Sequence, residues 1–261
     1  MKIVVINLAS EDARWIAVTR QFRAVGLEPT RVEAICGKAL TPRELRKLYS
    51  EELNRVQYHK RLLPGEIGCY ASHISVWQQL LESSDPHVAV FEDDVDVDAD
   101  LPETLAAIER APAQWDLIKL IGRQREKATT RFPLTLGRDL VEYRRVPGLT
   151  SAYVIDRRGA EKLLSRRVPF GRPIDVDLRH WWELDLRILG VHPYPVHLAP
   201  SSLLSTIEGR RTPTDARTRL HKTLLQARYT VRNWQATHGG VPVARPRHAR
   251  QPGPLADHPS P

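Results

Sequence analysis

The sequence predicts an α/β fold in which helices flank a β-sheet, and three observations lead to this class. The first segments read as strand, helix and strand, an order that favours a parallel sheet covered by helices. Val88 to Phe91 is an apolar run with no charge inside it, as expected of a buried central strand. Hydrophobic residues make up 41% of the 261-residue chain, which is enough for the core of one large domain.

The first hundred residues contain the clearest helix and strand signals. Ser10 is the expected N-cap of the first helix and Gly26 its stop. From Ile67 to Leu81, apolar residues recur every three or four positions, the spacing of one helix face. The predicted elements are a strand at Lys2 to Leu8, a helix at Glu11 to Val25, a strand at Arg31 to Ile35, a surface helix at Pro42 to Leu53, a helix at Gly65 to Leu81 and a strand at Val88 to Phe91.

The next hundred residues continue the alternation of helices and strands. Gly190 is expected to end the last helix of this part. The predicted elements are a helix at Leu101 to Glu109, strands at Trp115 to Ile121 and Ser151 to Ile155, helices at Gly159 to Ser165 and Asp175 to Leu189, and a last strand at Val191 to His197.

The positive charge of the chain is concentrated at its C-terminus. From Glu208 onward there are ten Lys and Arg against three Asp and Glu, whereas the preceding residues carry 29 against 28. A nearly neutral body argues against a nucleic-acid binder. We expect a globular domain at residues 1–207, a basic helical extension at 208–238 and a disordered, Pro-rich tail at 239–261.

The extension is predicted to form a helix over Thr214 to Trp234, with Leu220, Leu224, Tyr229 and Trp234 as anchors. Such a helix either packs on the body with a solvated face or lies on an anionic membrane surface. The sequence has no recognisable signal peptide and no run of about 18 apolar residues. We therefore expect a cytoplasmic protein, with the cytoplasmic face of the inner membrane as the surface that the helix would contact.

Six acidic residues crowd into nine positions directly after the predicted strand at Val88 to Phe91. Ligands of open α/β sheets bind beyond the carboxyl ends of strands, and crowded carboxylates need a cation, donors or full exposure. Mg²⁺ and Mn²⁺ prefer carboxylate oxygens and often share them with substrate phosphates. The run therefore predicts a divalent-cation site, and its members are Glu92, Asp93, Asp94, Asp96, Asp98 and Asp100.

Several interpretations of the acidic run stay open at this level. A calcium loop of the EF-hand type is excluded, because Ala99 stands where glycine is required and Leu105 where a bidentate glutamate is required. A solvated loop without function, a metal-dependent phosphoester hydrolase and a non-enzymatic binding module built on the basic segment are the alternatives. The hydrolase would need a second converging ligand set, which the sequence does not clearly offer.

An ordered set of motifs between about Lys2 and Ile207 resembles glycosyltransferase family 25. That family includes bacterial lipooligosaccharide galactosyltransferases and the collagen galactosyltransferases of animals. The motifs are Val5-Ile6-Asn7-Leu8 with Arg14, Arg31-Val32-Glu33-Ala34 with Gly37, Gly65-Glu66-Ile67-Gly68-Cys69 with Ser72-His73 and Trp77, Glu92-Asp93-Asp94, Thr150-Ser151-Ala152-Tyr153, Gly159-Ala160 with Leu163-Leu164, and Pro173-Ile174-Asp175.

The resemblance implies a GT-A-like, Rossmann-type mixed sheet flanked by helices and an inverting hexosyl transfer from a UDP-sugar, most often UDP-galactose. It implies Mn²⁺ or Mg²⁺ at the acidic motif, with Asp94 as the main ligand and Glu92 nearer the ribose or donor sugar. His197 is a further candidate ligand, because GT-A enzymes commonly take one from late in the chain. The acceptor is not fixed; in a bacterium it would be a glycan or glycolipid of lipopolysaccharide, lipooligosaccharide or capsule.

An inverting transfer needs a base for the acceptor hydroxyl, and Asp175 is our first candidate, with Asp177 second. Both carboxylates also suit the start of a helix, where they would have a structural role. Each donor-binding candidate has a structural alternative as well, such as a packed histidine or an exposed arginine. The donor-binding candidates are Asn7, Leu8, Arg14, Glu66, Ser72, His73, Glu92 and Asp93.

Overall fold

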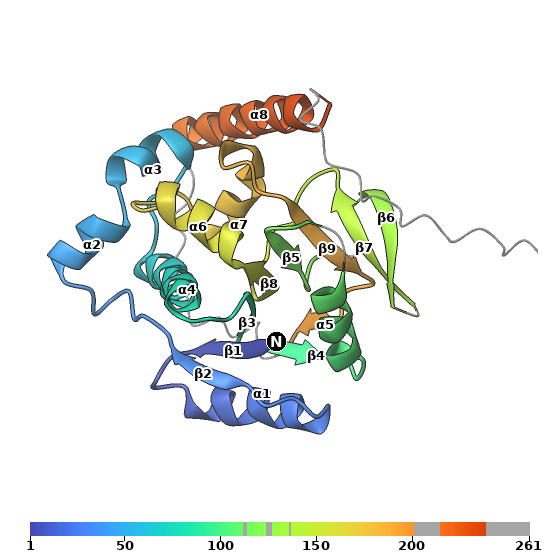
Figure 1. The fold of residues 1–261 in the computed structure, drawn as a ribbon. Coiled ribbons are helices and arrows are strands. Elements are labelled where there is room, and N and C mark those ends of the chain that lie inside the picture. The colour runs from blue at the N-terminus through green and yellow to red at the C-terminus, as the bar shows by residue number, and fades with distance from the viewer. Residues whose placement is uncertain (112–113, 124–126, 136, 201–214, 239–261) are drawn as a thin grey trace, which may run out of the picture.

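A mixed eight-stranded sheet runs through the protein, and helices cover both of its faces (Figure 1). The computed structural model describes residues 1–111, 114–123, 127–135, 137–200 and 215–238. The strands are β1 (Lys2–Asn7), β2 (Thr30–Glu33), β3 (His87–Glu92), β4 (Val95–Val97), β5 (Leu117–Lys119), β6 (Ala128–Thr135), β7 (Arg138–Tyr143), β8 (Ala152–Asp156), β9 (Ile188–His192) and β10 (Val196–Leu198).

The sheet order is β2-β1-β3-β8-β5-β9-β7-β6, and β4 and β10 form a separate antiparallel pair. Strands β2, β1 and β3 are parallel, whereas β8 runs antiparallel to β3. The helices are α1 (Asp12–Ala24), α2 (Pro42–Leu48), α3 (Glu51–Gln57), α4 (Pro64–Glu82), α5 (Leu101–Arg110), α6 (Arg157–Arg166), α7 (Ile174–Asp177), the 3₁₀ helix η1 (Leu178–Glu183) and α8 (Ala216–His238).

Two hydrophobic layers form because neighbouring side chains of a strand point to opposite faces of the sheet. Val88 and Val90 of β3 pack with α4 and α6, and Ala89 and Phe91 pack with α1 and α5. The ring of Phe91 meets that of Phe22 from α1 edge-on at 4.9 Å between centroids. The predicted class, an α/β fold with a mixed sheet flanked by helices, is confirmed.

Two predicted helices are interrupted where the chain makes other contacts. The helix predicted over Pro42 to Leu53 is two helices, because Tyr49 forms a strand-like bridge with Phe170 and the side chain of Ser50 then caps α3. Glu11 rather than Ser10 is the N-cap of α1. Gly26 does stop α1, with a φ of 78° that favours glycine.

The predicted helix from Asp175 to Leu189 is wrong in its second half. η1 ends at Glu183, and Asp185 takes a left-handed φ of 50°, after which Ile188–His192 forms strand β9. Gly190 therefore lies inside a strand, where a Cβ atom would come within 1.7 Å of the Tyr143 hydroxyl oxygen. The hairpin of β6 and β7, which extends the sheet at this edge, was not predicted.

Helix α8 packs on the body through one of its four predicted anchors, Tyr229, and not through the other three. Tyr229 and Asn233 are buried, whereas Leu220, Leu224 and Trp234 are 62%, 60% and 59% exposed. Among the described helices, none combines the length and apolar character needed to cross a membrane. The predicted tail at 239–261 and the start of the extension at 208–214 lie outside the described residues.

Candidate active site

The acidic motif lies at the carboxyl end of β3, beside the carboxyl end of β1. The two strands are parallel and in register, so that Ile6 stands opposite Glu92. The amide nitrogen of Asn7 donates to Asp93 Oδ2 at 2.6 Å, and Arg14 of α1 lies 3.2 Å from the other oxygen of the carboxylate. Burial raises the pKa of Asp93, while Asn7 and Arg14 oppose the increase. Asp93 therefore holds the first strand and helix against the strand tip.

The negative charge of Asp94 is compensated by fewer hydrogen bonds and ion pairs than that of Asp93. Its Oδ1 atom is buried and has no hydrogen-bond partner within the described part of the chain. Burial, followed by the charges of Glu92 and Asp93, raises the pKa of Asp94 to about 7. A divalent cation would give Oδ1 its missing partner and relieve the repulsion among these carboxylates, so the residues fit a metal of the Mg²⁺ or Mn²⁺ type.

The turn that carries Asp94 is fixed from the C-terminal part of the chain. The backbone nitrogen of Ala199 donates to the Asp94 carbonyl at 2.8 Å. Strand β4, which follows the turn, pairs with β10. The direction of the Asp94 side chain is therefore set by a segment about a hundred positions later in the sequence.

A cavity of about 390 Å³ opens at this strand tip, a size typical of small-molecule sites. Its walls come from the ends of β1 and β3, from α1, from the loop after β2 and from α4. Eight of the predicted donor-site and metal-site residues line it. They are Asn7, Leu8, Arg14, Ser72, His73, Glu92, Asp93 and Asp94.

The wall between the loop after β2 and α4 is packed backbone against backbone. A Cβ atom on Gly68 would lie 2.4 Å from the Ile35 carbonyl, and one on Gly37 would lie 1.8 Å from that of Pro64. Ser72 secures the contact, because its hydroxyl accepts from the Ile35 nitrogen at 2.8 Å and donates to the Gly68 carbonyl at 2.7 Å. The predicted donor residue Ser72 thus shapes the cavity by holding this loop.

A buried hydrogen-bond chain ends at Glu92. The indole nitrogen of Trp77 donates to the Tyr153 hydroxyl at 2.9 Å, and that hydroxyl lies 2.8 Å from His73 Nδ1. His73 Nε2 lies 3.3 Å from Glu92 Oε1. With a neutral His73, the arrangement is consistent if Tyr153 donates to Nδ1 and Nε2–H donates to Glu92. The chain then fixes the orientation of the Glu92 carboxylate.

The sequence-based predictions gave no role to several residues of this site. Trp77 and Tyr153 stand in the motifs that resemble family 25, but only the fold brings them to His73. The Cys69 sulfur, an imidazole nitrogen of His73 and a Glu92 oxygen lie within 4.8 Å of one another, a grouping that suits a metal ion. The i, i+4 spacing of Cys69 and His73 on a helix was the available signal.

Asp175, the first candidate base, lies near the strand tip in a partly buried position. Burial raises the pKa of Asp175; a hydrogen bond from Val176 and the charges of Lys119 and Arg179 oppose the rise, and Glu92 adds to it. Lys119 is 1% exposed, and its ammonium donates to the carbonyl oxygens of Pro147, Gly148 and Leu149. A buried cation therefore stands close to the candidate base, a feature that the sequence did not reveal.

Asp177, the second candidate base, is held in a network of ion pairs. The Tyr70 hydroxyl donates to its carboxylate at 2.5 Å, and Arg172 and Arg167 lie 2.5 and 3.2 Å from its oxygens. The Asp177 side chain is 3% exposed. The surroundings of Asp177 favour its structural alternative over the role of base, which remains a prediction.

Two further candidates lie outside the cavity lining. Glu66 accepts a hydrogen bond from the Leu63 backbone nitrogen at 2.8 Å, which gives this N–H group at the start of α4 an acceptor. His197 is 54% exposed, and its Nε2 atom lies 3.2 Å from Asp98 rather than beside Asp94. Their predicted roles in donor and metal binding therefore gain no support from the geometry.

Residues 1–178 match the family model described as Glycosyltransferase family 25 (LPS biosynthesis protein). The chain belongs to glycosyltransferase family 25. The family predicted from the sequence motifs is therefore confirmed. Every cavity-lining candidate lies within the matched region, as does Asp175.

The curated proteins that this family 25 chain resembles are longer than the chain itself. It is 34% identical over 189 residues to human "Procollagen galactosyltransferase 2", covering 67% of this chain and 29% of that protein. It is 27% identical over 230 residues to the bovine "Probable inactive glycosyltransferase 25 family member 3", covering 77% and 38%. The chain thus spans about a third of the length of these curated relatives. A solved structure of an active-site mutant of LgtC matches with 10% identity and a TM-score of 0.40 over 87% of this chain and 96% of that one.

Proposed function

We propose that this family 25 chain transfers a hexose, with galactose as the first choice, from a UDP-sugar to a glycan acceptor with inversion at the sugar carbon. The observation that carries the proposal is the buried, unpartnered Oδ1 of Asp94 in a cavity at the tip of β3. Galactose is preferred because the similar human protein is named a galactosyltransferase.

In this proposal the strand tip holds the diphosphate end of the donor. Asp94, with Glu92, would hold Mn²⁺ or Mg²⁺, which neutralises the charge of the departing nucleoside diphosphate. Arg14 adds a fixed positive charge at the cavity wall, and Asn7 and Leu8 border the nucleotide. The hydrogen-bond chain that runs from Trp77 through Tyr153 and His73 keeps the Glu92 carboxylate oriented while the donor binds.

Asp175 is proposed as the base that takes the proton of the acceptor hydroxyl. Its partial burial makes it a stronger base than an exposed aspartate, because the carboxylate is less well solvated. The positive charge of Lys119 nearby opposes this rise in the pKa of Asp175. Asp177 is less suited to the role of base, since its ion pairs with Arg167 and Arg172 would have to break first.

The proposed acceptor is a glycan or glycolipid of lipopolysaccharide or a related surface polysaccharide, in keeping with the description of the family. We further propose that α8 lies on the anionic cytoplasmic face of a membrane. Exposed Leu220, Leu224, Val231 and Trp234 follow one stripe of α8, and the helix has five Lys and Arg and no acidic residue. An apolar stripe flanked by cations suits such a surface.

The transfer is tested by incubating the protein with UDP-galactose and Mn²⁺ and measuring UDP release with and without EDTA. We expect release that EDTA abolishes and that a glycan acceptor stimulates. UDP-glucose and UDP-N-acetylglucosamine serve as matched donors. Metal-dependent cleavage of UDP itself, without dependence on the sugar, would instead support the phosphoester hydrolase.

Membrane contact is tested by co-sedimentation with vesicles of phosphatidylglycerol, with phosphatidylcholine vesicles as the neutral comparison. We expect binding to the anionic vesicles only, and loss of that binding in Leu224→Gln/Trp234→Gln. Both side chains are exposed, so the double variant should fold normally. Undiminished binding of this variant would contradict the proposed orientation of α8.

A further inference from the structure

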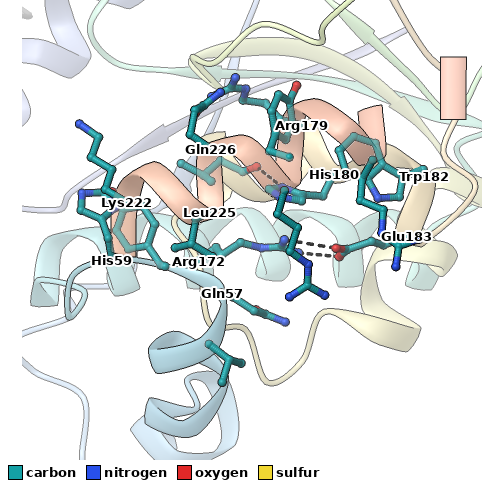
Figure 2. Close-up of a pocket in the computed structure, with 16 residues that line it drawn as sticks. Gln57, His59, Arg172, Arg179, His180, Trp182, Glu183, Lys222, Leu225 and Gln226 are labelled. Atoms are coloured by element: carbon teal, nitrogen blue, oxygen red, sulfur yellow. Dashed lines mark hydrogen bonds and ion pairs between the residues drawn. The ribbon is translucent and has the colours of Figure 1, made fainter. Parts of the chain in front are cut away.

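A second cavity, of about 670 Å³, lies beneath α8 and shares no lining residue with the cavity at the strand tip. Figure 2 shows its walls, which come from α8, from α7 with η1, and from the end of α3 and the residues that follow it. The volume suits a ligand of one or a few sugar rings. Nothing in the proposed donor chemistry uses this cavity.

The lining of the second cavity is strongly cationic. Five Lys and Arg side chains line it, and Glu183 is the acidic residue among the described lining residues. Arg172 is paired with Asp177 and Glu183. The other four cations have no ion pair in the part of the chain that the structure describes; they are Arg179, Lys222, Arg228 and Arg232. The cavity therefore carries an uncompensated positive charge.

Aromatic rings and unused donors accompany this charge. The ring of Tyr229 lies 5.5 Å from Trp182 between centroids, and the Arg179 guanidinium stands 4.6 Å from the Tyr229 ring. The Nε atoms of Arg172 and Arg179 and the hydroxyl of Tyr229 are buried and have no hydrogen-bond partner among the described residues. Buried donors without acceptors are costly, so these atoms point to a ligand that accepts hydrogen bonds.

The pKa values of two histidines in the lining, His59 and His180, are lowered by burial and by nearby positive charges. Burial, followed by the charges of Lys222, Lys60 and His221, lowers the pKa of His59. Burial and then the charge of Arg172 lower the pKa of His180 to about 4. Both shifts favour the neutral imidazole, and the positive charge of the cavity comes from its Lys and Arg residues.

We propose that this cavity binds a phosphate- or carboxylate-bearing sugar of the acceptor, an inference that rests on the proposed transfer. Guanidinium groups bind such anions through paired hydrogen bonds, and aromatic faces pack against sugar rings. Arg179 also connects the two regions, because it follows the candidate base Asp175 by one helical turn and its charge acts on that carboxylate. The anionic group of the acceptor would thus lie close to the sugar whose hydroxyl is glycosylated.

The test measures binding of glucose 6-phosphate, glucuronate, glucose and inorganic phosphate to the full chain by isothermal titration calorimetry. We expect the two anionic sugars to bind at least tenfold more tightly than glucose or phosphate alone. In Lys222→Gln/Arg228→Gln their affinity should fall about tenfold or more. The matched control is Arg217→Gln/Arg219→Gln, which removes the same charge from exposed sites of α8 outside the cavity.

Equal losses in the two double variants would overturn the proposal, since they would indicate non-specific attraction to a basic helix. Equal binding of inorganic phosphate and glucose 6-phosphate would overturn it as well, because the sugar would then not be recognised. Arg179→Gln is a further variant, and it should weaken anion binding through loss of a buried donor. UDP release from UDP-galactose without acceptor should be unchanged in Lys222→Gln/Arg228→Gln, so failure of anion binding and failure of transfer are distinguishable.

Discussion

Two buried carboxylates, Asp94 and Asp177, show how differently the same side chain is treated in two regions of the molecule. Asp177 lies between two arginines and a tyrosine hydroxyl. Asp94 lies beside two other carboxylates, and among the described residues no ion pair or hydrogen bond compensates its buried Oδ1, whereas Asp177 Oδ1 pairs with Arg172. The contrast teaches that a buried carboxylate whose charge is already paired stabilises the fold, whereas one whose charge is unpaired is available to a ligand. Neutralising each acid in turn tests this distinction.

The largest expected effect is on turnover in Asp94→Asn. Loss of the carboxylate should reduce UDP release from UDP-galactose by about 100- to 1,000-fold, the range for loss of one strong electrostatic contact at a reacting centre. Asp96→Asn is the matched control, because Asp96 belongs to the same acidic run but bonds Gln21 at 2.8 Å outside the cavity. Equal activity in the two variants would mean that the metal site is assigned to the wrong residue.

A smaller effect, on stability rather than turnover, is expected in Asp177→Asn. The substitution leaves Glu183 as the remaining ion-pair partner of the buried Arg167 and Arg172 among the described residues, and breaking a buried ion pair costs about 3–5 kcal/mol. Urea unfolding monitored by tryptophan fluorescence measures the change. Glu28→Gln, which breaks an exposed pair with Arg23, should cost about 0–1 kcal/mol. A stable Asp177→Asn protein with abolished turnover would restore Asp177 as the candidate base.

The smallest effect is a difference in pH dependence between the two regions. The pKa of Asp94 is raised from 3.8 to about 7 in the folded protein, so without metal its contribution to stability falls as pH rises through that window. Burial would raise the pKa of Glu183, but Arg172 and Arg167 lower it from 4.5 to about 2, so its contribution is lost as pH falls through that range.

Urea midpoints of the metal-free protein at pH 3, 5.5 and 7.5 separate these two contributions. Between pH 5.5 and 7.5 we expect a decrease that Asp94→Asn removes and that Mn²⁺ reverses. Between pH 5.5 and 3 we expect a decrease that becomes smaller in Glu183→Gln. A wild-type midpoint that rises from pH 5.5 to 7.5 in the absence of metal would contradict the account of Asp94.

The strand-tip site could be predicted from sequence because its signals are local. A charge-free apolar run that ends in Glu92, Asp93 and Asp94 indicates both the strand and the end at which the cavity opens. The position of Asp177 could not be predicted, because its partner Tyr70 lies 107 positions away. The end of η1 was missed since it depends on the left-handed backbone of Asp185, which aspartate tolerates without a distinctive pattern.

The pairing of β4 with β10 limits how far the chain can be shortened from its C-terminal side. The family model covers residues 1–178, yet Ala199 donates to the Asp94 carbonyl and β10 pairs with β4, which follows the acidic turn. A fragment trimmed to the matched region would keep Glu92 and Asp94 but lose the backbone contacts that hold the turn carrying Asp94. We therefore expect that a fragment must extend at least to Ala199 to keep this turn in place.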